Sequence, residues 1–216
     1  MQLSGPSLPP ADGKPARGLV ILLHGLGADG NDLIGLAPHW ARLLPHVAFI
    51  SPNAPFPCDM APYGYQWFSL QDRTPARVVA GVRAAWPILD GFIDEQLAAH
   101  KLTEDRLALV GFSQGCMMSL FTAPRRQRAV AGVVGYSGRL VDDGTMEGEI
   151  ASRPPMLLVH GTEDAIVPYE SLDLSREGLE ALQVPVETLS CPGLGHGIDP
   201  AGLEAGGAFL QRVLPA

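Results

Sequence analysis

The chain has 216 residues, of which 46% are hydrophobic, and this size and composition fit one domain with a sizeable core. Its formal net charge of −8, from 15 Lys plus Arg against 23 Asp plus Glu, argues against nucleic acid as a partner. No apolar run approaches the roughly 20 residues that span a bilayer, and the first ten residues lack the pattern of a signal peptide. We therefore expect no integral membrane association.

The cysteine content predicts reduced thiols. The three cysteines, Cys58, Cys116 and Cys191, are odd in number and far apart, which is typical of neither a disulfide framework nor a zinc site. We expect a cytoplasmic protein that uses no metal and no cofactor. Cys116 lies in an apolar segment and is interpreted as small core filler.

The first fifty residues predict a strand, a loop, a helix and a second strand. Residues 1–16 are rich in Pro and Gly and are expected to be a loose lead-in to a single domain over 17–216. An unbroken apolar run at 17–23 is typical of a central strand buried on both faces. A glycine-rich loop follows, then a helix at about 32–44 and a short strand at 47–50.

A long loop is predicted at residues 51–70, where four prolines exclude a helix. Long structureless loops in compact domains are usually functional, so this one could form a pocket wall, or it could fold its own aromatic side chains into a satellite core. Both interpretations stay open. The residues expected to bind substrate are Phe56, Met60, Tyr63, Trp67 and Phe68, together with Val167 from a later loop.

The rest of the chain alternates helical and strand patterns. The longest helical pattern, 74–99, contains Pro87, which should kink it. The other predicted strands are 107–110, 130–136, 156–159 and an edge strand at 184–190, and the other predicted helices begin at 116, 172 and 202. This alternation predicts an α/β fold with a mostly parallel sheet, helices on both faces and a site at the carboxyl ends of the strands.

One stretch, Gly111-Phe-Ser-Gln-Gly115, lies between an apolar strand and an apolar helix. In that context G-x-S-x-G indicates a nucleophile elbow, in which a strained turn exposes the serine and the glycines allow close packing. A plain strand-to-helix turn with Ser113 as a helix cap is the alternative. We predict Ser113 as the nucleophile.

Serine needs a base, and the base needs an orienting acid. His196, on a glycine-flanked loop late in the chain, is the preferred base, and His24 is the second candidate. Asp164 and Glu163, on the loop after the 156–159 strand, both qualify as the acid. Asp164 is preferred on reach, with Glu163 as the alternative.

An oxyanion needs two preset N–H donors. The residue after the nucleophile, Gln114, should supply one, and the glycine-rich loop at 24–27 should supply the other. Leu26 is the best candidate in that loop.

Four segments stand in an order that resembles the phospholipase/carboxylesterase family of α/β-hydrolases, which includes acyl-protein thioesterases and small bacterial carboxylesterases. They begin at His24, Gly111, His160 and Gly193, and the resemblance extends from about residue 17 to the C-terminus. It implies Ser113, Asp164 and His196 as a catalytic triad and Leu26 and Gln114 as oxyanion donors. It also favours Asp164 over Glu163.

The interval 138–153 is short and polar, with no room for a cap domain, so we expect an open site for small esters. The first hypothesis is a serine carboxylesterase that forms an acyl-enzyme on Ser113 and loses activity below about pH 6, where an unperturbed imidazole protonates. The alternatives are an acyl-protein thioesterase or lysophospholipase, and a non-catalytic ligand-binding homologue. The expected partner is a small-molecule ester, and a homodimer is left open.

Overall fold

The computed structural model describes residues 3–214 and 216. Its centre is a seven-stranded sheet in the order β1-β3-β2-β6-β7-β8-β9. Every neighbouring pair is parallel except β1 and β3, which pair antiparallel. The strands are β1 (Ser7–Leu8), β2 (Gly18–Leu23), β3 (Val47–Ile50), β6 (Leu107–Phe112), β7 (Gly132–Tyr136), β8 (Met156–Gly161) and β9 (Val186–Cys191). A separate two-stranded hairpin consists of β4 (Phe56–Pro57) and β5 (Tyr65–Gln66).

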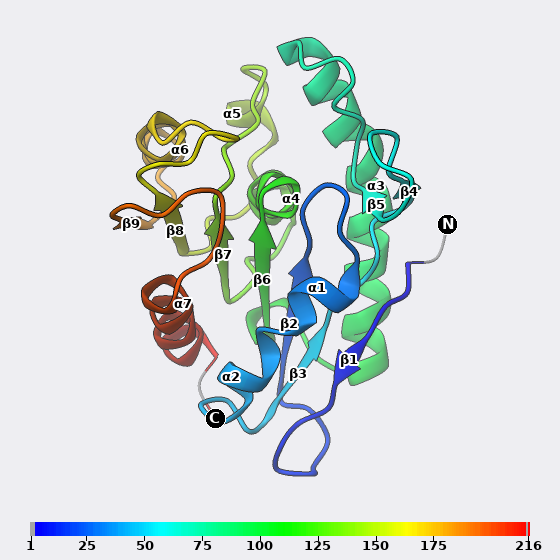
Figure 1. Ribbon diagram of the computed structural model, residues 1–216. Coiled ribbons are helices and arrows are strands. Elements are labelled where there is room, and N and C mark those ends of the chain that lie inside the picture. The colour runs from blue at the N-terminus through cyan, green and yellow to red at the C-terminus, as the bar shows by residue number, and fades with distance from the viewer. Residues whose placement is uncertain (1–2, 215) are drawn as a thin grey trace.

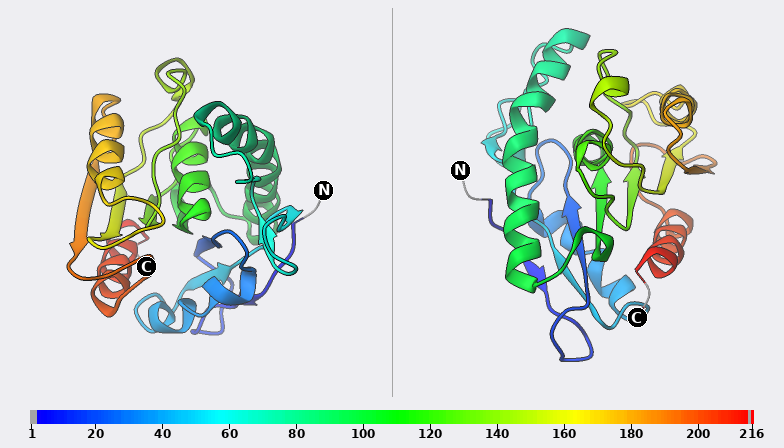
Figure 2. Two further views of the ribbon diagram at one scale, coloured as in Figure 1. Left: turned by 45° about the horizontal axis from the view of Figure 1, so that its top comes forward. Right: turned by 180° about the vertical axis from the view of Figure 1, so that it is seen from behind.

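Helices cover both faces of the sheet, as the alternating pattern predicts (Figures 1 and 2). One face carries α3 (Pro75–His100), α4 (Gln114–Thr122) and α6 (Glu170–Ala181), and the other carries α1 (Gly30–Ile34), α2 (Ala37–Ala41) and α7 (Pro200–Val213). The short α5 (Met146–Glu149) and two 3-10 turns, η1 (Glu104–Arg106) and η2 (Ala123–Arg125), complete the fold. In the described part of the chain, every helix is too short or too polar to cross a bilayer.

The central strands divide their side chains between two cores. In β2, Leu19, Ile21 and Leu23 pack with the α3–α4 side, whereas Val20 and Leu22 pack with the α2–α7 side. Successive residues of a strand point to opposite faces, so a strand buried on both sides must be apolar throughout. The unbroken apolar runs in the sequence follow from this position.

Three predicted elements differ in the structure. The predicted loop at 51–70 contains the β4–β5 hairpin. The helix expected at about 32–44 is two short helices, because α1 ends at Ile34 with Gly35 as its cap and α2 begins anew with Pro38 in its first turn. The lead-in at 1–16, expected to be loose, contains β1, and the backbone N–H groups of Ser51 and Asn53 bond to Pro6 and Ser4. This segment therefore covers one edge of the sheet.

Candidate active site

The turn between β6 and α4 holds Ser113 in an unusual backbone conformation. Ser113 has φ of 55° and ψ of −113°, a region that residues with a Cβ adopt only when the surrounding structure imposes it. A Cβ at Gly115 would overlap the backbone of Leu23, and one at Gly111 would overlap the backbone of Gly115. Only glycine at both positions lets α4 begin this close to the strands, which is the geometry predicted for a nucleophile elbow.

His196 reaches the same place on a loop that is fixed to the end of β8. Glu163 donates its backbone N–H to Leu194, and Gly193 donates to the Thr162 hydroxyl, both at 2.9 Å. On the far side, the Ser137 hydroxyl donates to the carbonyl of Gly197 at 3.3 Å. These bonds hold the residues on both sides of His196 and so fix its backbone.

Asp164 is the carboxylate that orients His196. Its Oδ2 lies 2.7 Å from His196 Nδ1, and its Oδ1 accepts the backbone N–H groups of Ile166 and Val167 at 2.9 Å. Burial raises the pKa of the Asp164 carboxyl, but the hydrogen bonds from His196, Val167 and Ile166 outweigh burial and hold the pKa below its usual value. Glu163, the alternative acid, is exposed and does not make this contact.

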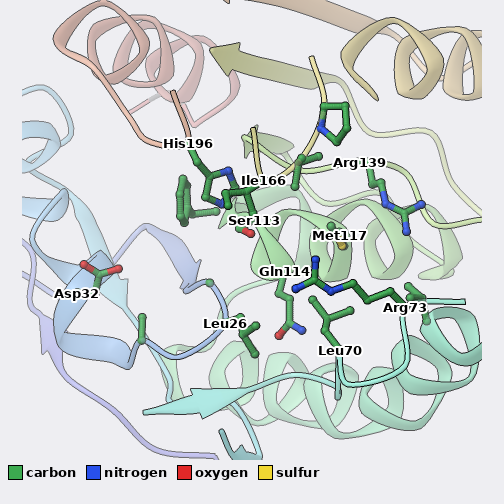
Figure 3. Close-up of a pocket in the computed structure, with 16 residues that line it drawn as sticks. Leu26, Asp32, Leu70, Arg73, Ser113, Gln114, Met117, Arg139, Ile166 and His196 are labelled. Carbon is green, nitrogen blue, oxygen red and sulfur yellow. The ribbon is translucent and has the colours of Figure 1, made fainter. Parts of the chain in front are cut away.

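Because Asp164 accepts from Nδ1, the Nε2 of His196 keeps its lone pair and is free to take a proton. Ser113 and His196 line one pocket and lie side by side in Figure 3. The ring of Phe112 supports the imidazole, with ring centroids 4.9 Å apart and planes tilted by 49°. A hydroxyl, an imidazole and a carboxylate from three different strand ends thus meet at one edge of the sheet.

The two other histidines at strand ends have structural bonds. His24 accepts the Ala54 backbone N–H at Nε2 (2.9 Å), so its Nδ1 carries the proton and donates to Gly25 (2.7 Å). Burial lowers the pKa of His24, which keeps it neutral. His160 bonds through Nε2 to the Val167 carbonyl at 2.9 Å and lies 3.3 Å from Asp164 Oδ2. His24, the second candidate base, is therefore occupied on both nitrogens.

The two predicted oxyanion donors lie at the pocket. Leu26 and Gln114 both line it, and the Gln114 N–H belongs to the first turn of α4, where N–H groups have no partner within the helix. The loop that carries Leu26 is bound to the hairpin, since Gly27 donates to Tyr65 (2.9 Å) and Tyr65 donates to Ala28 (2.8 Å). These bonds fix the backbone of the loop before substrate binds. Fixed N–H donors are what stabilisation of a developing negative charge requires.

The pocket has a volume of about 310 Å³, and most of the residues that line it are not the ones that were expected to bind substrate. Of the six residues expected to bind substrate, Val167 lines it. Trp67 and Phe68 are buried in the core, Met60 and Tyr63 are exposed, and Phe56 lies in β4. The residues that the sequence analysis did not assign to the pocket are Gly25, Ala28, Asp32, Leu70, Arg73, Val78, Phe112, Met117, Arg139, Ile166 and Pro168.

The aromatic loop instead positions the catalytic edge. The Gln114 side chain accepts the Trp67 backbone N–H (3.0 Å) and donates to the Phe68 carbonyl (2.8 Å), while the Trp67 indole donates to His24 (3.0 Å). The satellite-core interpretation therefore describes Trp67 and Phe68. The only sequence signal for this role was the polar end of Trp67, which needs a partner when buried.

Cys116 lies directly below the elbow but is not exposed to the pocket. It is buried in the core, and burial raises the pKa of its thiol to about 12. The three cysteines are unpaired. Among the described residues, no group of three His, Cys, Asp or Glu side chains is placed to hold a metal ion.

A parallel sheet with helices on both faces, an elbow serine and a carboxylate-bonded histidine define a serine hydrolase with the α/β-hydrolase fold. The chain belongs to the phospholipase/carboxylesterase family, whose model matches residues 10–214. It is 33% identical to acyl-protein thioesterase 1 of Emericella nidulans over 94% of this chain and 93% of that protein.

A second curated relative and one solved structure agree with this assignment, and another solved structure shares the fold. Acyl-protein thioesterase 1 of Schizosaccharomyces pombe is 34% identical over 90% of each chain. The crystal structure of esterase PE8 superposes with a TM-score of 0.95 at 39% identity, covering 99% of this chain and 100% of that one. Acyl-protein thioesterase 2 of Zea mays, at 23% identity and a TM-score of 0.73 over 96% and 97% of the two chains, shares the fold.

Proposed function

We propose that this protein is a carboxylesterase that hydrolyses small carboxylic esters through an acyl-enzyme on Ser113. The observation that carries the proposal is that Ser113, held at positive φ, lines one pocket with His196, whose Nδ1 lies 2.7 Å from Asp164. The similarity to esterase PE8 along the whole chain supports an ester substrate. The unpaired cysteines support a reducing compartment, and we propose the cytoplasm.

In the first half of the reaction, His196 Nε2 takes the proton of the Ser113 hydroxyl as its oxygen attacks the ester carbonyl. The N–H groups of Leu26 and Gln114 stabilise the resulting oxyanion, and Asp164 stabilises the imidazolium. His196 then gives its proton to the leaving alcohol. In the second half, water attacks the acyl-enzyme with His196 as the base, and the acid leaves while Ser113 regains its proton.

The size of the site favours small substrates. The pocket, at about 310 Å³, is at the lower end for ligand sites. Between β7 and β8 the described chain forms only loops and the four-residue α5, so no cap domain encloses a longer channel. A thioesterase for longer acyl chains is the second candidate, favoured by the curated relatives that are acyl-protein thioesterases. Parallel assays of short aryl esters and palmitoyl thioesters separate the two.

Covalent labelling tests the proposal directly. A fluorophosphonate should modify Ser113 in the native protein, and Ser113→Ala should abolish both the adduct and ester hydrolysis. Ser119→Ala is the matched control, since Ser119 is a buried serine of α4, the helix that follows Ser113, and its hydroxyl donates to the Gly115 carbonyl. A folded native protein that forms no adduct at Ser113 would overturn the esterase proposal.

A further inference from the structure

Two arginines that the catalytic chemistry does not use line the pocket. Arg73 comes from the loop before α3, and Arg139 follows the end of β7. Figure 3 shows both guanidinium groups on one side of Ser113, with Asp32 on the other. The charged lining of the pocket is therefore divided, with positive charge at one end and a single carboxylate at the opposite end.

Neither arginine has a carboxylate partner among the described residues. Arg73 is exposed and Arg139 is partly buried, and in the described part of the chain Arg42, Arg128 and Arg153 likewise form no ion pair, whereas the other arginines do. Arg83 and Arg125 share Glu149, and Arg126 binds both Asp90 and Asp94. In a chain with 23 acidic side chains against 15 basic ones, two unpaired guanidinium groups at the reaction site leave a local anion-binding capacity.

Much of the remaining pocket lining is apolar. Leu70, Val78, Met117 and Val167 belong to the lining of the same pocket. A ligand that fills the pocket and reaches a guanidinium therefore also needs methylene groups that pack against these side chains. Guanidinium groups bind carboxylates and phosphates through paired N–H donors, and the carboxylate is the smaller of the two groups for a pocket of about 310 Å³.

We infer that the preferred substrate is an ester that carries one carboxylate, separated from the scissile carbonyl by a short aliphatic segment and bound by Arg73 and Arg139. This inference rests on the proposed esterase function and names its substrate class. The carboxylate belongs either to the acyl chain, as in a dicarboxylic acid monoester, or to the alcohol, as in an acylated hydroxy acid. The net charge of −8 repels anions generally, so the preference comes from these two side chains.

Matched ester pairs test the substrate class. The acyl-side pair is monomethyl glutarate and methyl pentanoate, and the alcohol-side pair is the acetate ester of γ-hydroxybutyrate and butyl acetate. In one pair, kcat/KM for the anionic ester should exceed that for the neutral ester about tenfold, the effect of a charge-assisted bond that is partly screened by solvent. The pair that responds identifies the side on which the carboxylate lies.

Substitutions assign the preference to the two arginines. Arg73→Gln and Arg139→Gln should each reduce the anionic-to-neutral ratio severalfold, and the double variant should bring it close to one. Arg128→Gln removes the same charge from an exposed arginine outside the pocket and should keep the native ratio. Arg73→Lys should keep part of the preference for the anionic ester. In the native protein, high salt should lower the anionic-to-neutral ratio.

The outcomes separate this inference from the proposed function. Hydrolysis of the neutral esters with no preference in either pair would overturn the carboxylate inference and leave the esterase proposal standing. A preference that survives in the double variant would also overturn it. If the native protein hydrolyses none of the four esters, the esterase proposal itself fails.

Discussion

At the scale of single residues, the Asp164 carboxylate is the most constrained group of the site. It accepts the backbone N–H groups of Ile166 and Val167, bonds to His196 and has His160 Nε2 at 3.3 Å. A carboxylate with this many donors stays ionised and cannot rotate away from the imidazole. The same bonds explain why Asp164, and not its neighbour Glu163, turns inward.

Replacing this carboxylate by an amide should nearly abolish catalysis. In Asp164→Asn, the amide no longer fixes the tautomer of His196 or stabilises its charged form, and kcat should fall about 10³–10⁴-fold. The measurement is kcat on a neutral ester, with thermal unfolding to confirm that the variant is folded. Glu163→Gln, one residue away and exposed, should retain native kcat. Equal losses in both variants would contradict the assignment of Asp164.

The sequence predicts the residues that we propose to react better than the residues that surround them. Ser113, Asp164 and His196 are recognisable because each follows a strand, and parallel strands end at one edge of a sheet. The side-chain directions in the 51–70 loop depend on distant bonds, such as that of the Trp67 indole to His24. No local pattern encodes such bonds, so the sequence left open whether the loop is a pocket wall or a satellite core, and the expected pocket residues Trp67 and Phe68 are buried in the core.

At the scale of elements, the approach of α4 to the sheet depends on glycine. In Gly115→Ala, the added methyl would overlap the Leu23 carbonyl, which is backbone of the central strand and cannot move aside. Overpacking of this kind costs about 1–3 kcal/mol or more of unfolding free energy, and it should also shift Ser113 and reduce activity. Denaturant unfolding and ester hydrolysis measure the two effects.

The same Gly→Ala substitution at a position with free space should raise the unfolding free energy instead of lowering it. Gly91 lies within α3, and a methyl group there would meet nothing within 4 Å. Gly91→Ala should therefore stabilise the protein by about 0.5–1 kcal/mol, because alanine loses less backbone entropy in a helix. Destabilisation by both variants would show that the space around residue 115 is not the cause.

The helix predicted at 32–44 shows what periodicity can and cannot determine. Its apolar stripe is real, since Leu33, Trp40 and Leu44 are all buried against one face of the sheet. The stripe continues across the break between α1 and α2, so the apolar periodicity does not reveal that the helix is interrupted. Pro38, which lacks an N–H and fits the first turn of a helix, was the local signal for a new start.

At the scale of the whole molecule, the catalytic edge is joined to the core through His24. Its imidazole bonds Ala54 and Gly25, and its carbonyl accepts the Trp67 indole, so it connects the end of β2 with the 51–70 loop. This arrangement requires a neutral imidazole, because Nε2 must accept a hydrogen bond. Protonation would place a charge in a fully buried position and would turn the new Nε2–H toward the Ala54 N–H, which is itself a donor.

Global stability should therefore decline in mild acid. Burial lowers the pKa of His24 in the folded protein, whereas the unfolded chain titrates near the ordinary value of 6.5. Below that value the unfolded state binds a proton that the folded state does not, so stability is fully present above about pH 7 and is lost as pH falls toward the folded pKa. For one group the slope is at most about 1.4 kcal/mol per pH unit.

Unfolding free energies measured in denaturant at pH 7.5 and pH 5.5 test this linkage. His24→Gln should be less stable than the native protein at pH 7.5, because it replaces a fitted imidazole, but it should lose less stability between the two pH values. His39→Gln removes an exposed imidazole from α2 and should keep the native pH dependence. If His24→Gln keeps the full loss in acid, the buried imidazole of His24 is not its source, and other groups at the sheet edge must account for it.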